Sequence, residues 1–331
     1  MSPRRRTVAP HFVRPSGVTS TPTTPERGGR REDAVLERIL EIVEGKGLLK
    51  EIRIIGDDCA VLPPLVGETL VSTDVCVYGV HLDETLFSVD DLGYKAMTSA
   101  ISDIAAMGGR VRGALVGVAA PAGTDLELLH QGVARAAELT GCPVVGGDLT
   151  SAPHLAVTVT VLGECPSGGA IRRSGAAGGD TLLVTGPLGR AAAGLRRARD
   201  GASGQDELVL AQRHPWPRLA EGQAARGARV SAMMDLSDGL ALDLDRLARA
   251  SGVGVEIDNV PVAEGATPEE AWSGGEDYEL LIATPEPDRL AMIFADRGLR
   301  PPLRIGRCVD DAMVRRRDGR TFTGEGFQHS W

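Results

Sequence analysis

Apolar residues first recur with a regular period at about residue 32. From Glu32 they follow the three- and four-residue spacing that places side chains on one face of a helix, and Gly45 supplies a stop signal. Residues 1–31 are rich in Pro, Thr, Ser and Arg and have no apolar face whose burial could offset ordering entropy. The sequence therefore predicts a disordered tail over 1–31, followed by a helix. The apolar residues of that helix are Val35, Leu36, Ile39, Leu40 and Val43.

Short runs of β-branched and apolar residues, bounded by turn residues, follow this helix. They have the length of strands, and helical spacing returns between them. Ser88 with Asp91, and Thr124 with Glu127, have the spacing of capping boxes, which predicts the starts of two helices. The expected strands occupy 52–55, 69–72, 111–119, 143–145 and 155–163.

A glycine-rich stretch over 166–179 separates this half from a second half with its own strand-like and helix-like segments. The chain has 331 residues, about twice the length of a typical domain. We therefore predict two folded domains, over 32–165 and 166–331. Their alternating segments indicate α/β or α+β character, but periodicity does not determine the order of the strands.

Charge is unevenly distributed along the chain. Residues 1–31 carry seven Arg and one acid, whereas the other residues carry 29 basic and 44 acidic side chains, a net charge of −15. A protein with this negative net charge repels the phosphate backbones of nucleic acids. Aromatic residues, at 3%, are also too few for the stacking surfaces of single-strand binders. We therefore expect no nucleic-acid partner, and we expect a metal ion between the protein and any anionic ligand.

The sequence also lacks the features of a membrane or exported protein. No apolar stretch approaches the roughly 18 to 20 residues that cross a bilayer, and no apolar segment follows the N-terminal arginines. The five cysteines are odd in number and widely spaced, which matches neither a zinc site nor a disulfide framework. We expect a cytoplasmic protein with no membrane partner.

A strand-like run that ends in small residues and then an acid occurs four times. Asp103 adds a carboxylate within an otherwise apolar or small segment, where an unpaired charge would be costly to bury. A single Asp at a strand end is most often a turn or cap residue. Together, however, these acids predict a site for Mg²⁺, which prefers carboxylate oxygens. They are Asp57 and Asp58 after IRIIG, Asp74 after TLVST, Asp148 after PVVGG, and Asp235 after SAMM with Asp238 three residues on.

Common motifs of phosphate and hydrolytic enzymes are missing from the sequence. There is no G-x-x-x-x-G-K-[ST], G-x-G-x-x-G, H-R-D or D-F-G, which removes the main support for P-loop, Rossmann and protein-kinase folds. There is also no G-x-S-x-G or H-E-x-x-H. Only three lysines are present, so neutralising a triphosphate depends on metal ions and arginine. These features favour magnesium-dependent phosphoryl transfer by positioning and charge neutralisation.

Eight segments form a specific combination: IGDDCAVL (55–62), STD (72–74), GVHLD (79–83), DLGYKAMTSAISDIAAMGG (91–109), VGGD (145–148), RRSGA (172–176), DLSDGL (235–240) and SGGEDYEL (273–280). Together they closely resemble the thiamine-monophosphate kinase family, in the superfamily of aminoimidazole ribonucleotide synthetase and selenophosphate synthetase. The resemblance runs in order over roughly nine tenths of the chain, and DLSDGL with SGGEDYEL is nearly diagnostic.

The resemblance implies a two-domain synthetase-like fold of the α/β plus α+β class. In this fold the N-terminal domain, over 32–165, binds ATP and Mg²⁺, and its strands form a β-barrel with the same domain of a second subunit in a homodimer. The C-terminal α+β domain, over 166–331, completes the ATP and substrate site. ATP and several Mg²⁺ ions are expected in the cleft between the domains.

The resemblance also assigns roles to individual residues. No covalent nucleophile is expected. The implied metal ligands are Asp58, Ser72, Thr73, Asp74, Asp103, Asp148, Asp235 and Asp238. The implied nucleotide-binding residues are Gly147, Asp148, Arg173 and Ser237, and the residues that face thiamine monophosphate are His81, Glu276 and Phe327.

Four positions depart from the family pattern and leave alternatives open. The sequence has Leu149 and Ser151 after VGGD, Ala100 in the long helix, and Thr140 before a glycine, each in place of a different residue type. The first hypothesis is ATP-dependent phosphorylation of thiamine monophosphate to thiamine diphosphate by direct in-line transfer. A second is a superfamily synthetase that activates a carbonyl or amide oxygen of another small molecule. A third is a nucleotide-binding regulator without turnover, which the retained acids disfavour.

Overall fold

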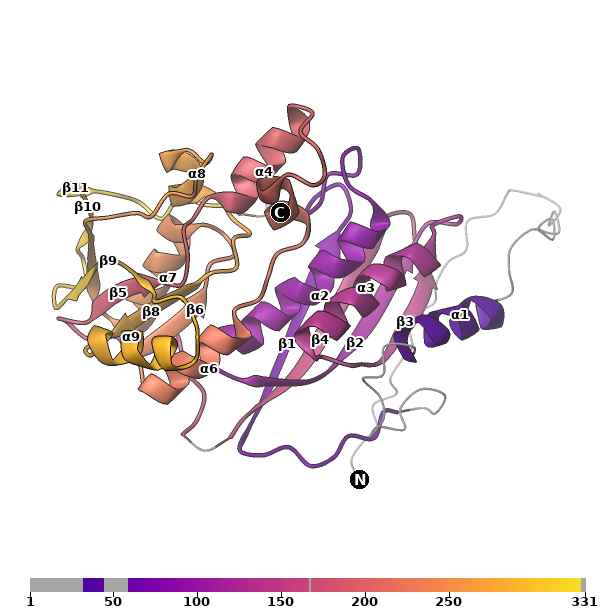
Figure 1. Ribbon diagram of the computed structural model, residues 1–331, viewed down its shortest axis with the longest axis horizontal. Helices are drawn as coiled ribbons and strands as arrows, with labels where there is room; N and C mark the ends of the chain where they lie inside the picture. The colour runs from indigo at the N-terminus through magenta and orange to yellow at the C-terminus, as the bar shows by residue number, and fades with distance from the viewer. Residues whose placement is uncertain (1–31, 45–58, 167, 329–331) are drawn as a thin grey trace, which may run out of the picture.

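The computed structural model describes residues 32–44, 59–166 and 168–328, which form two β-sheets with helices packed on them (Figure 1). The predicted tail over 1–31, the predicted strand over 52–55 and the predicted ligand Asp58 lie outside these residues. The first helix, α1 (Glu32–Glu44), begins and ends where the sequence predicts. None of the helices in the described ranges is both long and apolar enough to span a membrane.

The first sheet has four strands in the order β1-β4-β2-β3. Its strands are β1 (Glu68–Val77), β2 (Arg110–Ala120), β3 (Val144–Ser151) and β4 (Ala156–Cys165). β4 pairs antiparallel with β1 and β2, whereas β3 pairs parallel with β2. The four predicted runs in this half of the chain are thus confirmed as strands, although β1 and β3 continue several residues beyond them. The sheet is open in the single chain.

The two faces of this first sheet differ. The inner face packs against α2 (Val89–Ala106) and α3 (Leu126–Thr140) (Figure 1). Buried valines such as Val116 and Val159 line this face. The outer face is exposed: Val71 retains 64% of its accessible surface and Leu115 retains 39%. Apolar side chains on an exposed sheet face are typical of an interaction surface.

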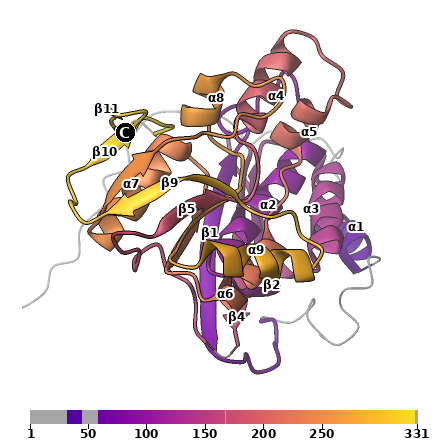
Figure 2. The same ribbon diagram turned by 60° about the vertical axis from the view of Figure 1, so that its left-hand side comes forward.

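The second sheet has seven strands in the order β11-β10-β7-β9-β5-β8-β6. Its elements are β5 (Thr181–Val184), β6 (Ala232–Asp235), β7 (Gly254–Ile257), β8 (Leu280–Thr284), β9 (Leu303–Val309), β10 (Arg315–Arg317), β11 (Arg320–Thr321), α6 (Leu219–Ala228), α7 (Leu240–Ser251), α8 (Pro268–Ser273) and α9 (Pro287–Asp296). The helices α7 and α8 lie on one side of this sheet and α6 and α9 on the other (Figure 2). Along β5, Leu182 and Val184 pack with α7 and α8, whereas Leu183 packs with α6 and α9. Because side chains alternate along a strand, both faces of this sheet are covered.

Two short helices from the second half of the sequence pack on the core of the first half. Val209 of α5 (Glu207–Arg213) is buried in the same apolar cluster as α2 and α3, with Leu195 of α4 (Arg190–Arg199) packed against it. α6 also packs on α2, where Ala105 and Ala106 join its cluster. These contacts fix the position of α4, α5 and α6 relative to α2.

The helix starts test two of the predicted caps. Ser88 and Asp91 form the predicted capping box at α2. The second predicted box, Thr124 with Glu127, is wrong, because the N-cap of α3 is Asp125. The Asp125 carboxylate accepts a hydrogen bond at 3.0 Å from the backbone N–H three residues on. An ionised carboxylate one position later is a stronger acceptor than the threonine hydroxyl.

Candidate active site

A cleft of about 590 Å³ opens between α2 and β1 on one side and the loops that flank β6 and β8 on the other. The α4–α5 segment borders it as well. Among the described residues that line it, Arg199 is the only Arg or Lys. Such a lining attracts cations and repels anions that carry no counter-ion. Its carboxylates come from Asp74, Asp83, Asp103, Asp235, Asp238 and Glu276.

Four of the predicted metal ligands meet in this cleft. Asp74 comes from β1, Asp103 from α2, Asp235 from the end of β6, and Asp238 from the loop before α7. Asp235 follows its strand as predicted. Asp74, in contrast, lies within β1, because that strand continues to Val77. Carboxylates from four separate elements therefore converge on one space.

Two adjacent residues of α2, Ser102 and Asp103, make hydrogen bonds that connect the helix to the two sheets. The Ser102 hydroxyl donates a 2.7 Å hydrogen bond to Asp235 Oδ2 in the second sheet. Asp103 accepts a hydrogen bond from the hydroxyl of Ser72 in the first sheet. Ser72, also a predicted metal ligand, thus lies beside the cluster. Adjacent residues of α2 therefore contact Ser72 of the first sheet and Asp235 of the second.

The electrostatics of the cluster favour a bound cation. Burial, together with the nearby charges of Asp103 and Asp238, raises the pKa of Asp74 to about 6. Burial also raises the pKa of Asp103, against the opposing effects of Ser72 and Arg173. The pKa of Asp235 is raised by burial and by the charge of Asp103. The raised pKa values mean that these carboxylates repel one another when ionised, and a bound cation would relieve that repulsion. Their oxygens are hard ligands, which suit divalent cations such as Mg²⁺.

The loop that carries Ser237 and Asp238 is fixed by two residues of α7. Asp243 accepts hydrogen bonds from the backbone N–H groups of Ser237 at 3.1 Å and Asp238 at 3.0 Å. Arg246 donates to the carboxylate of Asp238 at 2.5 Å and to that of Asp243 at 2.7 Å. Ser237, a predicted nucleotide-binding residue, lines the cleft beside Asp238.

All three predicted acceptor-side residues line the same cleft. His81 Nδ1 accepts a 3.0 Å hydrogen bond from a backbone N–H, and Phe327 keeps 45% of its surface exposed. Glu276 is held at both oxygens: Oε1 lies 2.7 Å from Lys95 Nζ, and Oε2 accepts a 3.0 Å hydrogen bond from Gln212 Nε2. As the sequence indicated, Glu276 belongs to a loop rather than to the start of a helix.

Asp148 and Thr73 face away from this cluster. In the register of the first sheet, Asp148, Gly117, Thr158 and Val75 form one row across the four strands. Paired residues face the same side of a sheet, so Asp148 lies on the outer face with the exposed Val75, opposite to its neighbour Asp74. The Thr73 hydroxyl contacts that of Thr160 at 3.0 Å on the outer face.

The remaining predicted nucleotide-binding residues lie outside the lining of the cleft. Gly147 precedes Asp148 in β3 and is exposed. Arg173 is exposed, and it is near enough to Asp103 for its charge to oppose the rise in the pKa of that carboxyl. Neither Gly147 nor Arg173 borders the 590 Å³ cleft.

Sequence reasoning missed several residues of the cleft or its wall. Lys95 could have been identified from the sequence, because it is one of only three lysines in the chain and lies in the family segment over 91–109. Gln212 and Arg199 come from α5 and α4, and no pattern in the sequence connects them with the acids. Tyr278 and Asp83 lie within quoted motifs, but as single residues they have no distinctive spacing.

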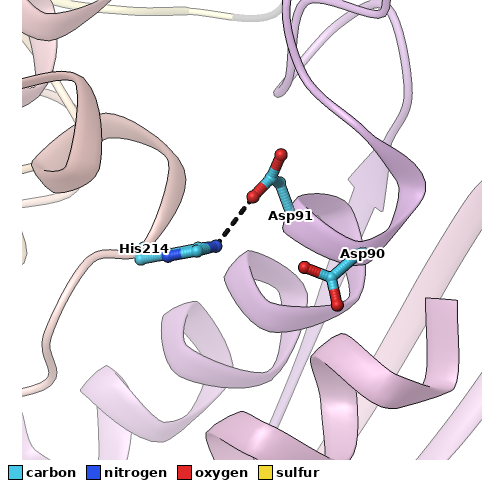
Figure 3. Close-up of side chains that lie close together, drawn as sticks. All are labelled: Asp90, Asp91 and His214. Carbon is cyan, nitrogen blue, oxygen red and sulfur yellow. Dashed lines mark ion pairs between the residues drawn. The ribbon is translucent and has the colours of Figure 1, made fainter. Parts of the chain in front are cut away.

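Another group of potential metal-ligating side chains, Asp90, Asp91 and His214, lies at the start of α2 (Figure 3). Its ligand atoms already have protein partners. Arg135 donates to both oxygens of Asp90, at 3.0 and 2.8 Å, and Asp91 Oδ1 lies 2.7 Å from His214 Nε2. Asp91 Oδ2 accepts hydrogen bonds from the hydroxyl and backbone N–H of Ser88. We interpret this group as a helix cap with ion pairs.

Replacing Asp91 with alanine is expected to lower the free energy of unfolding by about 2 kcal/mol. Burial opposes ionisation of Asp91, but hydrogen bonds from His214 and Ser88 outweigh it and lower its pKa to about 2. The stabilisation is therefore present above the ordinary pKa of 3.8 and is lost as the pH falls towards 2. Urea titrations at neutral pH test the effect. Asp125→Ala, which removes the exposed cap of α3, is the control and should lower the free energy of unfolding by only about 1 kcal/mol. If Asp91→Ala lowers the free energy of unfolding by no more than Asp125→Ala does, the expectation is contradicted.

Two family matches cover most of the chain. The AIR synthase related protein, N-terminal domain, matches residues 56–165, and the AIR synthase related protein, C-terminal domain, matches residues 177–318. Among curated relatives, the thiamine-monophosphate kinase of Salmonella typhimurium is 38% identical over 300 residues, which covers 83% of this chain and 91% of the relative.

Solved structures agree with these matches. Thiamine-monophosphate kinase from Stenotrophomonas maltophilia K279a is 31% identical, with a TM-score of 0.76 and coverage of 90% of this chain and 98% of that one. AaThiL complexed with AMPPCP and TMP is 29% identical, with a TM-score of 0.72 and coverage of 90% and 97%. Acids from elements of both halves meet at one cleft, and the similarity extends along most of the chain, so the chain belongs to the thiamine-monophosphate kinase family.

Proposed function

We propose that this chain transfers the γ-phosphate of ATP to the phosphate of thiamine monophosphate, which yields thiamine diphosphate and ADP. The observation that carries the proposal is the single cleft in which four carboxylates meet the three acceptor-side residues. Family membership supports it. The AaThiL structure complexed with an ATP analogue and TMP gives a precedent for both ligands in one protein of this fold.

The metal-binding part of the proposal rests on the acid cluster. Asp74, Asp103, Asp235 and Asp238 would hold Mg²⁺ ions between them. When bound, the ions supply positive charge that neutralises the phosphates of ATP and of the acceptor. The family resemblance proposes four further ligands: Ser72, which lies beside this cluster, together with Asp58, Thr73 and Asp148. Thr73 and Asp148 lie on the outer face of the first sheet, so they would hold an ion on that face and not between these four acids.

The residues of the chain then act by positioning. An oxygen of the acceptor phosphate attacks the γ-phosphorus in line, and the bond from that phosphorus to the β–γ bridging oxygen breaks as ADP leaves. Cys76 is the cysteine that lines the cleft, and burial raises the pKa of its thiol to about 12. A thiol that is protonated at neutral pH is a poor nucleophile, which agrees with direct transfer and no phosphoenzyme.

Nucleotide and acceptor occupy different ends of the site in this proposal. Ser237 and Arg173, with Gly147 and Asp148, would bind the nucleotide phosphates. At the other end, the exposed ring of Phe327 offers a face for an aromatic ring, with His81 and Glu276 beside it. The cationic thiazolium ring of thiamine suits the acidic surroundings.

An assay of ADP release separates this function from its alternatives. The purified protein is supplied with ATP, Mg²⁺ and one acceptor at a time: thiamine monophosphate, other phosphomonoesters, or carboxamides. We expect release with thiamine monophosphate and little with the others. Release with a carboxamide alone would indicate a synthetase, and binding of ATP without release for any acceptor would indicate a regulator.

We propose a homodimer whose outer sheet faces close into an intersubunit barrel. The exposed valines and leucine of the outer face give the surface, and a second copy would cover the edge strands as well.

We also propose the division of the chain into domains over 32–165 and 166–331. A cytoplasmic location agrees with the ATP requirement.

Val71→Asp is expected to convert the dimer to a monomer, because it places a charge on the outer sheet face that the proposed interface would bury. Light scattering at micromolar concentration measures the mass, which should fall from twice 34.7 kDa to 34.7 kDa. Met292→Asp, at an exposed position of α9 in the second sheet's layer, should leave the mass unchanged. A wild-type protein with the mass of one chain would contradict the dimer.

A further inference from the structure

Lys95 is a completely buried lysine in the middle of α2. Its ammonium group has two partners, His81 and Glu276, which come from distant parts of the sequence and both line the cleft. It donates a 3.0 Å hydrogen bond to the carbonyl of His81, and it lies 2.7 Å from Glu276 Oε1. A buried ammonium is costly without such partners, so its position is tightly determined by them.

The carboxylate of Glu276 is fixed from a second direction. Its Oε2 accepts a hydrogen bond from Gln212 of α5 at 3.0 Å. Lys95 and Gln212 therefore occupy both oxygens, one from each half of the sequence. This geometry orients the carboxylate at the wall of the cleft instead of leaving it free to rotate.

The backbone around Glu276 is also constrained. Glu276 has a φ of 69°, in the left-handed region that costs energy for a residue with a side chain. The next residue, Asp277, is half-buried and accepts hydrogen bonds from the backbone N–H groups of Gly189, at 2.5 Å, and Ala191, at 3.0 Å. The loop is thus tied to the start of α4, so the backbone of Glu276 is held in place as well as its carboxylate.

We infer that Lys95 is a positioning residue for the acceptor: its ammonium group fixes the separation between His81 and Glu276, two residues of the acceptor end. This inference rests on the proposed function. Lys95 does not line the cleft, so it acts through its two partners and not by touching the substrate. The nucleotide end, at Ser237 and Asp238, is held separately by Asp243 and Arg246.

Removing the ammonium group has a specific consequence. In Lys95→Met the Glu276 carboxylate loses its counter-charge, and the carbonyl of His81 loses its donor. Glu276 would then rotate away from the neighbouring acids, and the acceptor would meet a wall of altered shape. The nucleotide end keeps its own contacts, so the effect falls mainly on acceptor binding.

Steady-state kinetics of the full-length Lys95→Met enzyme test the inference. We expect the KM for thiamine monophosphate to rise about tenfold or more, as for the loss of a charged hydrogen bond, with the KM for ATP changed less than about twofold. Arg135→Met is the matched control, because it removes a cation that pairs with Asp90 of α2 outside the cleft. It should leave both KM values unchanged.

The variant Glu276→Gln, alone and combined with Lys95→Met, completes a double-mutant cycle. If Lys95 acts through Glu276, the double variant should have nearly the same acceptor KM as Glu276→Gln alone. The double variant also lacks the unpaired carboxylate, so it keeps the test valid if Lys95→Met folds poorly. Fully additive effects, or an unchanged acceptor KM in an active Lys95→Met enzyme, would overturn the inference and leave the kinase function standing. A wild-type enzyme inactive on thiamine monophosphate would overturn both.

Discussion

Asp103→Asn is expected to lower kcat by about 10²-fold or more, the effect of removing an electrostatic stabiliser of a transition state. Asp103 lies in α2 beside Asp74, and the helix joins it through Ser102 to Asp235 of the second sheet. Asparagine keeps the size and the hydrogen bond with Ser72 but removes the charge. The loss should therefore appear in the chemical step, measured as single-turnover formation of thiamine diphosphate.

Two comparisons make this result specific. His81→Ala, on the acceptor side, should raise the KM for thiamine monophosphate with a smaller effect on ATP. Asp200→Asn, at the exposed C-terminal cap of α4, removes an acid outside the cleft and should leave the rate unchanged. Near wild-type turnover by Asp103→Asn would contradict the role given to the acid cluster.

Removal of divalent metal is expected to weaken ATP binding by about 10²-fold, because the cleft is lined by six carboxylates and one arginine. Calorimetric titration of ATP into the protein, with Mg²⁺ and with excess chelator, measures the difference. Because the pKa of Asp74 is raised to about 6, protonation below that pH should weaken the metal-dependent binding as well.

Ionic strength must be matched in the two titrations, since screening by salt alone reduces the repulsion between ATP and the cleft. Sodium chloride at the ionic strength of the magnesium buffer is the control and should not restore affinity. Equal affinity for ATP with and without divalent metal would contradict the multi-metal interpretation of the site.

Much of the first domain could be predicted from local sequence. The spacing of Val35, Ile39 and Val43 predicted α1, and the Ser88–Asp91 box predicted the start of α2, because both signals depend on neighbours within one or two turns. The end of β1 was harder to predict from the sequence. Asp74 has small and polar neighbours that indicate a strand end, yet pairing with β4 extends the strand beyond it.

The arrangement of the site depended on contacts that no local pattern records. The acids could be identified as a group, but the side of the sheet that each one faces follows from strand register, which is why Asp148 and Asp74 point in opposite directions. Likewise, Gln212 reaches Glu276 only because α5 packs on the core of the first half. Such long-range contacts are set by tertiary packing and not by propensity.

The fate of the γ-phosphate tests the central claim most directly. The wild-type enzyme is incubated with ATP labelled at the γ-phosphorus, thiamine monophosphate and Mg²⁺, and the label is then located. The account predicts label in the terminal phosphate of thiamine diphosphate, with none on the protein. Label recovered only as inorganic phosphate, or attached to the protein, would contradict direct transfer between the two substrates in this cleft.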